Sequence, residues 1–478
     1  MDSRISARAL AAALGGWRTR TPAYEALADG IRLLCLDNRL APRTALPAER
    51  ELAAVLGLSR ATVTAAYRSL RESGQIDSLR GAGSITLPLR RRAASTIEPG
   101  VDAIDLQQAS PAAWPGLAGV MSEVAQDAAT LVARAGYDVV GSPALRTAIA
   151  ERYTSSGLPT SPAQIMVTTG AQSAIHLIAG VFLRRGDRAL IETPTYPHAA
   201  DALRAAGARL VEVPVTTGTG WDLDRAAQAL ARTSPAVAYL MPRFQNPTGR
   251  TMSRRDQECI ALSAQRSGTL LIVDDTTADL AIDAPTAEMP FAGPLAERTP
   301  IVRVGSLSKT VWGGLRIGWI RAELDDIRRL ASERPRRDLG TPEFEQAVAE
   351  RLFPLLPEIV AQRSVLLREG RDALVGALRQ RLPEWTVPSV GGGVSLWVEL
   401  GAPLSGSLLL AARPHGVHLS AGPRFAAVGG HDRHLRLPFT SPADELRRAV
   451  DVLAEVWPAV RLAAPDPTAA PEPAAAVV

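Results

Sequence analysis

The stretch that most constrains the fold is residues 301–310, which read IVRVGSLSKT. Its first four residues are mostly apolar and β-branched, as in a buried strand, and Lys309 lies just after them. Lys309 is the only lysine among the 53 lysine and arginine residues of the chain. A desolvated ammonium can lose its proton and form an imine, which a guanidinium cannot. The stretch therefore predicts a reactive amine at the carboxyl end of a strand, although a chance lysine on a surface helix would also explain the count.

Further apolar runs rich in β-branched residues precede this stretch and alternate with helical patterns. The expected strands are Ile165–Thr168, Ala189–Glu192, Val237–Met241 and Leu270–Val273, in addition to Ile301–Val304. Such alternation predicts an α/β fold with a mostly parallel sheet.

Polar groups follow several of these strands. Residues 168–173 leave a strand and open a helix, so that their backbone N–H groups would suit phosphate oxygens. Asp274 ends a strand and would suit a protonated ring nitrogen, Asn246 lies in the turn QNPTG, and Tyr196 could stack on a ring. Together with Lys309, these are the groups that pyridoxal phosphate requires. Singly, each has a structural explanation as a helix entry, a turn acid, a β-turn or a core ring.

The first 90 residues predict a different kind of domain. Apolar residues at Leu27, Ile31 and Leu34 lie on one face of a helix over 24–36, a second helix covers 48–56, and Ser59 would cap a third. Residues 76–87, folded at 80–83, would form a hairpin. Three helices and a hairpin in this order predict a winged helix-turn-helix, whose second motif helix enters the major groove of DNA.

The charge of the chain is divided unevenly between its parts. The whole chain carries a net charge of +4, but the first 92 residues hold 15 arginines against 8 acidic residues. A basic amino-terminal region ahead of a mildly acidic remainder is expected when one domain binds a polyanion.

Composition excludes several classes of protein. Hydrophobic residues make up 46% and charged residues 21%, which is typical of globular proteins rather than disordered or fibrous ones. The two cysteines, Cys35 and Cys259, are too few for a disulfide framework or a set of zinc fingers, so we expect a reducing cytoplasm and no metal. No apolar run is long enough to span a membrane, and Arg8 interrupts the alanine-rich stretch 7–16, so we expect no signal peptide.

The amino-terminal region resembles the winged helix-turn-helix of GntR-type transcription regulators. The resemblance rests on residues 46–53, 57–63, 67–70 and 79–84. It implies that six residues face DNA: Arg50, Arg60, Thr62, Thr64, Arg80 and Gly81. Arg60 begins the recognition helix, where a bidentate contact to guanine is natural, while Arg50 and the wing would hold phosphates.

The remainder resembles fold-type I aminotransferases of class I/II, which have a large α/β domain and a small α+β subdomain. The resemblance implies that Lys309 is the Schiff-base lysine, that Asp274 binds the pyridine nitrogen, and that Arg436 binds a substrate carboxylate. It implies a wider cofactor site made of Gly170, Ala171, Gln172, Tyr196, Asn246, Ser306, Ser308 and Arg316. Tyr137 matches a tyrosine that reaches the phosphate across a dimer interface.

One pair of residues departs from the family pattern. Members usually carry a tyrosine two or three residues after the aspartate, where this chain has Thr276 and Thr277. A threonine side chain is shorter than that of tyrosine, and its hydroxyl is far less acidic than a phenol. The family's imine pKa and transamination rate are therefore not carried over to this chain.

The two resemblances together identify the chain as similar to the MocR/GabR subfamily of GntR regulators. We predict a DNA-binding domain at 1–87, a linker at 88–106, an aminotransferase-like domain at 107–463 and a disordered tail rich in proline and alanine at 464–478. The expected protein is a cytoplasmic, head-to-tail homodimer that binds pyridoxal phosphate, operator DNA and an amine or amino-acid effector. An active aminotransferase and a sensor of pyridoxal phosphate itself are the alternatives.

Overall fold

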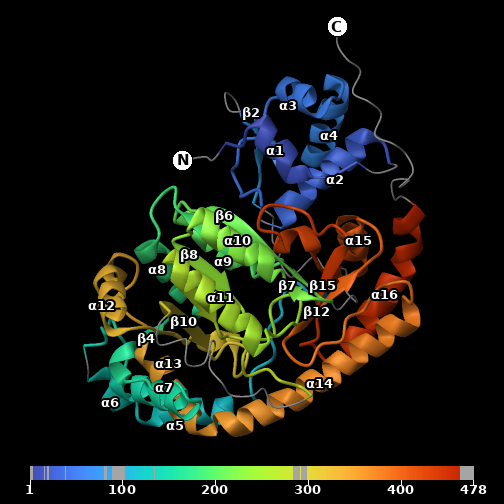
Figure 1. The fold of residues 1–478 in the computed structure, drawn as a ribbon. Helices are drawn as coiled ribbons and strands as arrows, with labels where there is room; N and C mark the ends of the chain where they lie inside the picture. The colour runs from blue at the N-terminus through green and yellow to red at the C-terminus, as the bar shows by residue number, and fades with distance from the viewer. Residues whose placement is uncertain are drawn as a thin grey trace.

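The computed structural model describes residues 4–15, 17–18, 21–37, 39–79, 83–88, 103–133, 135–283, 291 and 299–462. A small amino-terminal head sits beside a large α/β region and a smaller carboxyl-terminal subdomain (Figure 1). Most of the expected linker and the expected tail lie outside the described residues, as do Arg80 and Gly81 of the expected wing. None of the described helices is both long and apolar enough to cross a membrane.

Within its described residues, the head contains four helices and a hairpin. The elements are α1 Ala7–Leu14, α2 Ala23–Leu36, α3 Glu49–Leu56, α4 Arg60–Glu72, β1 Ile76–Leu79 and β2 Gly83–Thr86. The last three helices and the antiparallel hairpin were expected, but the expected number of three helices was wrong. The additional helix α1 forms because Leu10 and Leu14 lie one turn apart and are buried in the head core, while Ser6 accepts a hydrogen bond from the N–H of Ala9.

The turn between α3 and α4 follows from two residues. Gly57 ends α3 in the left-handed conformation (φ +65°), which costs a glycine little. Ser59 then caps α4, because its hydroxyl accepts a hydrogen bond from the N–H of Thr62 at 3.1 Å. The start of the expected recognition helix is therefore determined by local sequence.

An eight-stranded, mostly parallel sheet forms the centre of the molecule. Its strands are β4 Ile165–Thr168, β5 Arg188–Thr193, β6 Arg209–Thr216, β7 Gly220–Trp221, β8 Val237–Leu240, β9 Leu270–Asp274, β10 Ile301–Ser306 and β11 Gly318–Arg321. They lie in the order β4-β11-β10-β9-β8-β5-β6-β7. The run from β10 to β6 is parallel, whereas β11, β4 and β7 are antiparallel to their neighbours. All five expected strands are present, and the predicted α/β fold is confirmed.

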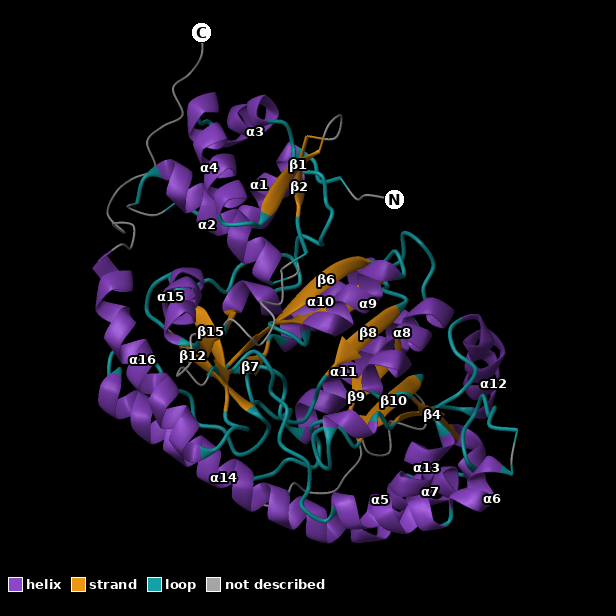
Figure 2. Ribbon diagram, turned by 180° about the vertical axis from the view of Figure 1, so that it is seen from behind, coloured by secondary structure: helices purple, strands orange, loops and turns teal. Residues whose placement is uncertain are grey.

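Helices cover both faces of this sheet (Figure 2). They are α5 Leu117–Gln126, α6 Ala128–Val132, α7 Pro143–Ser155, α8 Ala171–Phe182, α9 Pro197–Ala205, α10 Leu223–Thr233, α11 Arg254–Ser267, α12 Leu324–Glu333 and α13 Glu343–Leu352. Successive strand residues alternate between the faces: Val237 and Tyr239 pack with α8 and α9, and Ala238 and Leu240 pack with α10 and α11. Burial on both faces explains why these strands are apolar throughout.

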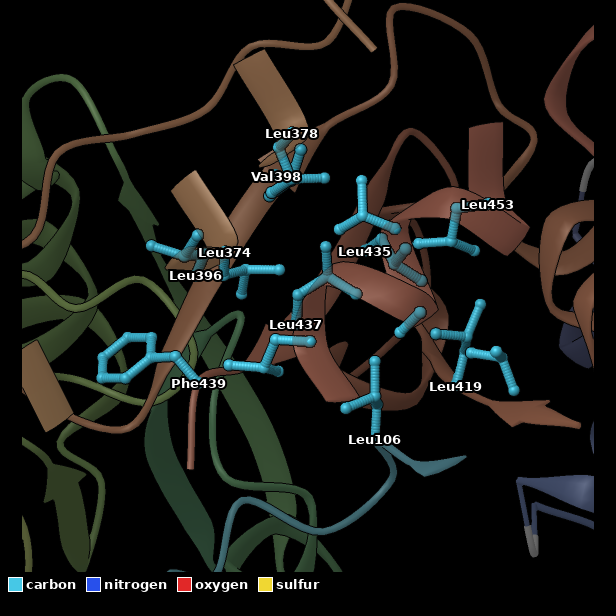
Figure 3. Close-up of a cluster of buried hydrophobic side chains, with 14 of the residues drawn as sticks. Leu106, Leu374, Leu378, Leu396, Val398, Leu419, Leu435, Leu437, Phe439 and Leu453 are labelled. Atoms are coloured by element: carbon cyan, nitrogen blue, oxygen red, sulfur yellow. The ribbon is translucent and has the colours of Figure 1, made fainter. Parts of the chain in front are cut away.

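The carboxyl-terminal subdomain packs two long helices against a small sheet. Its elements are α14 Leu356–Arg381, β12 Ser395–Glu399, α15 Ser405–Ala412, β13 Val417–His418, β14 Ser420–Ala421, β15 His434–Pro438 and α16 Ala443–Leu462. The short strand β3 Ile104–Asp105 joins it by pairing with β13. Leucines from α14, β12, β15 and α16 meet in its core, and Leu106, which follows β3, packs among them (Figure 3).

Candidate functional site

A cavity of about 540 Å³ lies between the carboxyl ends of the parallel strands and the small subdomain. It brings together eight of the residues expected to react with or bind the cofactor and Arg436, expected to bind a substrate carboxylate; the eight are Ala171, Gln172, Tyr196, Asn246, Asp274, Ser308, Lys309 and Arg316. Gln107, Gln108, Trp312, Thr276, Thr277 and Arg424 also line it. Residues separated by more than 300 positions thus share one cavity.

Lys309 is carried into this cavity by the turn after β10. Burial, and to a smaller extent the nearby Arg436 guanidinium, lowers the pKa of its ammonium from 10.5 to about 8, while Asp274 opposes the shift. A substantial fraction of the amine is therefore unprotonated only slightly above neutral pH. This is the state in which an amine reacts with an aldehyde.

Asp274 ends β9 with only 1% of its surface exposed. Burial raises the pKa of its carboxyl, and hydrogen bonds from Thr276 and Tyr239 act in the opposite direction. The Tyr239 hydroxyl donates to Oδ2 at 2.5 Å, and the N–H of Thr276 donates to Oδ1 at 2.9 Å. Tyr239 was not expected at the site. The sequence feature that could have indicated its role is its place in the strand β8, which pairs with β9.

A cradle for an anion forms where β4 passes into α8. Gly170 has φ +83°, and a Cβ there would lie 2.6 Å from Nη2 of Arg316. Arg316 donates to the carbonyl oxygens of Thr169 at 2.9 Å and Gly313 at 3.2 Å, which holds its guanidinium beside the first turn of α8. A guanidinium and helix N–H groups that converge on one point suit a phosphate.

Ser306 binds the backbone of the segments next to this cradle. Its hydroxyl donates to the carbonyl oxygen of Ile317 at 2.9 Å and accepts from the N–H of Ser308 at 3.1 Å. The hydroxyl therefore orders the turn that carries Lys309.

The turn that carries Asn246 is held from beneath by a buried carboxyl. The amide nitrogen of Gln245 donates to Glu192 at 3.2 Å and to the carbonyl oxygen of Pro194 at 2.6 Å. Glu192 also accepts from the N–H of Met241 and the indole of Trp221, and burial raises the pKa of its carboxyl to about 7. Glu192 and Gln245 were not expected to contribute to the site, because their contacts join strands distant in sequence.

Arg436 projects from β15 on the opposite wall of the cavity. Its guanidinium donates to the carbonyl oxygen of Gln107 and lies 5.0 Å from the ring centroid of Phe425. Burial lowers its pKa to about 10. A buried guanidinium of this kind suits a carboxylate.

Three buried polar atoms of the cavity lack a hydrogen-bond partner within the described structure: Oε1 of Gln172, Oδ1 of Asn246 and Nε of Arg436. Buried polar atoms are rarely left unpaired in native proteins. The unpaired atoms, the phosphate cradle, the buried carboxyl and the amine together fit pyridoxal phosphate with a carboxylated ligand.

The two threonines that replace the usual tyrosine line the same cavity. The Thr277 hydroxyl already donates to the carbonyl oxygen of Arg243 at 2.7 Å. Thr276 contributes its backbone N–H to Asp274. Neither threonine offers a phenol.

Tyr137 does not reach this cavity. It is 75% exposed and lines a separate cavity of about 580 Å³ together with Leu131, Ser142 and Gln346. Tyr137 is therefore not placed to contact a phosphate bound in the first cavity of its own chain. Its expected contact with the phosphate of a second chain across a dimer interface stays a prediction.

The described part of the head presents several arginines to solvent. Arg50 on α3 and Arg60 at the start of α4 are exposed. Thr62 and Thr64 are half-buried, and the Thr64 hydroxyl donates to Glu49 at 2.7 Å while that of Thr62 lies 2.8 Å from the Ser59 hydroxyl. The threonine hydroxyls thus stabilise the start of α4, and Arg60, whose Nε lies 3.9 Å from the Glu49 carboxylate, keeps a largely exposed side chain.

Among the described residues, no group of three or more histidine, cysteine, aspartate or glutamate side chains has the arrangement of a metal site.

Two family models match the chain in succession. The model described as bacterial regulatory proteins of the gntR family matches residues 23–85, and the model of aminotransferase class I and II matches residues 120–453. The first match covers the head from α2 to β2, and the second covers both regions that form the cavity.

Relatives of both kinds resemble the chain. The aromatic-amino-acid aminotransferase 1 of Thermococcus litoralis is 32% identical over 66% of this chain and 78% of its own length. The uncharacterized HTH-type transcriptional regulator YdfD of Bacillus subtilis is 26% identical over 84% of this chain and 89% of its own. The α-aminoadipate aminotransferase LysN of Thermus thermophilus, solved with N-(5′-phosphopyridoxyl)-L-leucine, matches with a TM-score of 0.69 and 27% identity over 75% of this chain and 93% of its own.

Proposed function

Since this chain belongs to the aminotransferase class I and II family and carries a gntR-family DNA-binding domain in front of that region, we propose that it is a transcription regulator that binds pyridoxal phosphate. The order of the two domains is that of the MocR/GabR subfamily, and relatives that extend over most of both chains are named HTH-type transcriptional regulators. The observation that carries the proposal is the combination, in one chain, of a DNA-binding head with a cavity built around the single lysine.

The cavity supports pyridoxal phosphate as the cofactor. When bound, the cofactor supplies an aldehyde for an amine and a pyridinium ring that withdraws electrons. In this proposal Gly170, Ala171 and Arg316 bind its phosphate, and Asp274 holds a proton at the ring nitrogen. The Lys309 amine binds the aldehyde carbon, for which its lowered pKa prepares it. Tyr196 and Asn246 orient the ring.

Arg436 supports an effector that carries a carboxylate. Its buried guanidinium faces the cavity from the small subdomain, with Nε unpaired within the described structure. An amine or amino acid would offer its carboxylate to Arg436 and its amine to the cofactor. A sensor of pyridoxal phosphate alone would not need this arginine, which favours an effector with both groups.

The proposed assembly is a head-to-tail homodimer in the cytoplasm, where its DNA target would be found. The exposed side chain of Tyr137 supports a second copy as the partner of that surface. Two basic heads in one dimer would bind paired operator half-sites.

An active aminotransferase is the second candidate, because Lys309, Asp274 and Arg436 are also what transamination requires. Thr276 and Thr277 weigh against turnover, since they supply no phenol at the ring oxygen. Steady release of a keto acid from an amino acid, measured with purified protein and no DNA, would establish the enzyme instead.

Absorbance spectroscopy tests the cofactor. Adding pyridoxal phosphate to the wild-type protein is expected to shift the visible band of the cofactor. Lys309→Ala and Lys309→Arg should abolish this shift, the second while keeping a positive charge. A shift that persists in both variants would refute the role of Lys309.

Binding to an operator selected from random DNA tests the head. Arg60→Ala is expected to weaken specific binding by about 1–3 kcal/mol and to change binding to random DNA little. The matched control is Arg68→Ala, which removes an exposed arginine farther along α4 and should affect both DNAs alike. Equal losses on both DNAs for Arg60→Ala would make Arg60 a phosphate contact.

A further inference from the structure

The charged side chains of the cavity are mostly cationic. Among the described residues that line it, they are Asp274, Lys309, Arg316, Arg424 and Arg436, with His198 beside them. The proposed function assigns the phosphate to Arg316, the ring nitrogen and the aldehyde to Asp274 and Lys309, and a carboxylate to Arg436. It gives Arg424 no role. A guanidinium on the wall of a ligand cavity favours a further anionic group on the ligand.

The position of Arg424 follows from the small sheet. Arg424 lies in the 3-10 turn Gly422–Phe425, directly after β14. Ser420 of β14 pairs with Arg436 of β15, so the turn leaves the sheet beside the arginine expected to bind a carboxylate. The ring centroid of Phe425, the residue after Arg424, lies 5.0 Å from the Arg436 guanidinium. The turn therefore places both guanidiniums on the wall of one cavity.

Asp201 on α9 binds Arg424 from the large region. Nη2 of Arg424 lies 3.1 Å from Oδ2 of Asp201. Asp201 also pairs with Arg204 at 3.5 Å, so one carboxylate serves two guanidiniums within the described structure. A guanidinium carries five N–H donors, and a contact to a shared carboxylate leaves both donors and positive charge for a ligand. The Arg424 side chain is only 15% exposed, which limits the screening of this charge by solvent.

The helix α9 brings this ion pair close to the expected place of the cofactor ring. It begins directly after Tyr196. The ring of His198 lies 5.4 Å from that of Tyr196, and its Nδ1 lies 3.7 Å from Asp201. Tyr196, His198 and Arg424 all line the cavity. An amino acid held at the cofactor and at Arg436 therefore meets Arg424 as a further cation of the same cavity.

We propose that Arg424 binds a second carboxylate of the ligand, so that the effector is a dicarboxylic amino acid. This inference rests on the proposed function and names the chemical class of its effector. The α-carboxylate binds Arg436, the amine meets the cofactor, and the side-chain carboxylate binds Arg424. Asp201 keeps a cationic partner when Arg424 turns to the ligand, because Arg204 remains beside it.

Binding of paired adducts tests this inference. The probes are the N-(5′-phosphopyridoxyl) adducts of L-glutamate and L-aspartate, each compared with the adduct of its amide, L-glutamine or L-asparagine. The members of a pair have nearly the same shape and differ by one negative charge. In wild type, the acid adduct of at least one pair should bind at least about tenfold more tightly than its amide, as measured by calorimetry.

Substitution of Arg424 should remove this preference. In Arg424→Gln, the dissociation constant of the preferred acid adduct should rise by at least about tenfold, while that of its amide stays within about threefold of wild type. Arg424→Lys keeps the charge and should retain part of the preference. The matched control is Arg413→Gln, which removes an exposed arginine from the 3-10 turn Arg413–His415 of the same subdomain and should change neither constant.

A substitution of Asp201 separates ligand binding from a structural role of the ion pair. Asp201→Asn releases Arg424, so the acid adduct should bind at least as tightly as in wild type. If the ion pair only held the turn in place, Asp201→Asn and Arg424→Gln would both weaken the acid and amide adducts alike, and Arg424 would not be a ligand contact.

The protein loaded with pyridoxal phosphate gives an independent readout. The free acid should change the visible absorbance of the cofactor at a lower concentration than its free amide, and Arg424→Gln should bring the two concentrations together.

The results distinguish this inference from the function on which it rests. If the adducts bind the wild type but acid and amide bind equally in both pairs, or if Arg424→Gln leaves the preference intact, the inference is refuted and the cofactor site stands. If no adduct binds the wild type, the proposed function fails and the inference fails with it.

Discussion

Asp274 shows how individual residues determine the chemistry of the cavity. Its position at the end of a buried strand was readable from the sequence, but its charge depends on donors from other places in the chain. Tyr239 and Thr276 each donate to one carboxyl oxygen. Burial raises the pKa of this carboxyl, and the two donors oppose that shift, which favours a carboxylate beside a pyridinium.

Tyr239→Phe should therefore weaken the binding of pyridoxal phosphate, by about tenfold for the loss of one hydrogen bond to a charged group. The loss of a donor raises the pKa of Asp274, so its carboxyl protonates at a higher pH as the solution is acidified. The affinity for pyridoxal phosphate should then decline at a higher pH in the variant than in wild type, as measured by absorbance titrations at several pH values.

Tyr153→Phe is the control for this comparison, because Tyr153 is a half-buried tyrosine whose hydroxyl accepts from the indole of Trp319 instead of donating to Asp274. Its pH profile should match that of wild type. Superimposable profiles for Tyr239→Phe and wild type would show that Tyr239 does not support the charge of Asp274.

At the scale of elements, the long helix α14 holds the turn that carries the lysine. Arg363 on this helix is buried and donates to three carbonyl oxygens: Thr310 at 3.0 Å, Val311 at 3.0 Å and Ala112 at 2.9 Å. Thr310 directly follows Lys309. A helix of the small subdomain thereby sets the position of the reactive amine.

Arg363→Met should lower the free energy of unfolding by about 2–4 kcal/mol, because it removes three buried hydrogen bonds, and of their acceptors the carbonyl oxygen of Val311 still accepts from the N–H of Trp114. The affinity for pyridoxal phosphate should fall as well, since the turn at Thr310 loses its anchor. Chemical denaturation with and without cofactor measures both effects.

Arg379→Met, on the exposed face of the same helix, should change stability by no more than about 0.5 kcal/mol. A similar small effect for Arg363→Met would mean that the turn is held by the strand alone.

At the scale of the whole molecule, several of the most exposed apolar side chains among the described residues lie on or near α6 and the segment that follows it. Val132 is 80% exposed, Tyr137 75% and Leu339 53%. Gly340, next to Leu339, lies against the backbone of Asp138, so these residues belong to one region. Exposed apolar side chains that gather in this way favour an interface with another protein surface.

Tyr137→Asp should accordingly shift the protein from dimer toward monomer, with a dimer dissociation constant at least about tenfold higher than that of wild type. The physical reason is the cost of burying an unpaired carboxylate in an interface. Analytical ultracentrifugation over a range of concentrations measures the shift.

Leu462→Asp places the same charge on another exposed apolar side chain, at the end of α16, and should leave association unchanged. If Tyr137→Asp and Leu462→Asp change the dimer dissociation constant equally, the interface does not lie at Tyr137.

The sequence by itself determined five of the eight strands of the central sheet, three helices of the head, and the chemical groups at the strand ends. Helix caps such as Ser59, the buried strands and the groups at their ends, Lys309 and Asp274 among them, are local patterns, because period and turn chemistry act over a few residues. The helix α1 escaped prediction since its apolar face is short and rich in alanine.

Only the tertiary structure decided which residues support those groups. Tyr239 reaches Asp274 from a neighbouring strand, Arg363 reaches Thr310 from a helix more than 50 positions away, and Arg424 of the small subdomain reaches Asp201 on α9. These contacts depend on how strands are ordered in the sheet and how the small subdomain packs against the large region. Such an arrangement follows from the packing of the whole chain, and no short stretch of sequence encodes it.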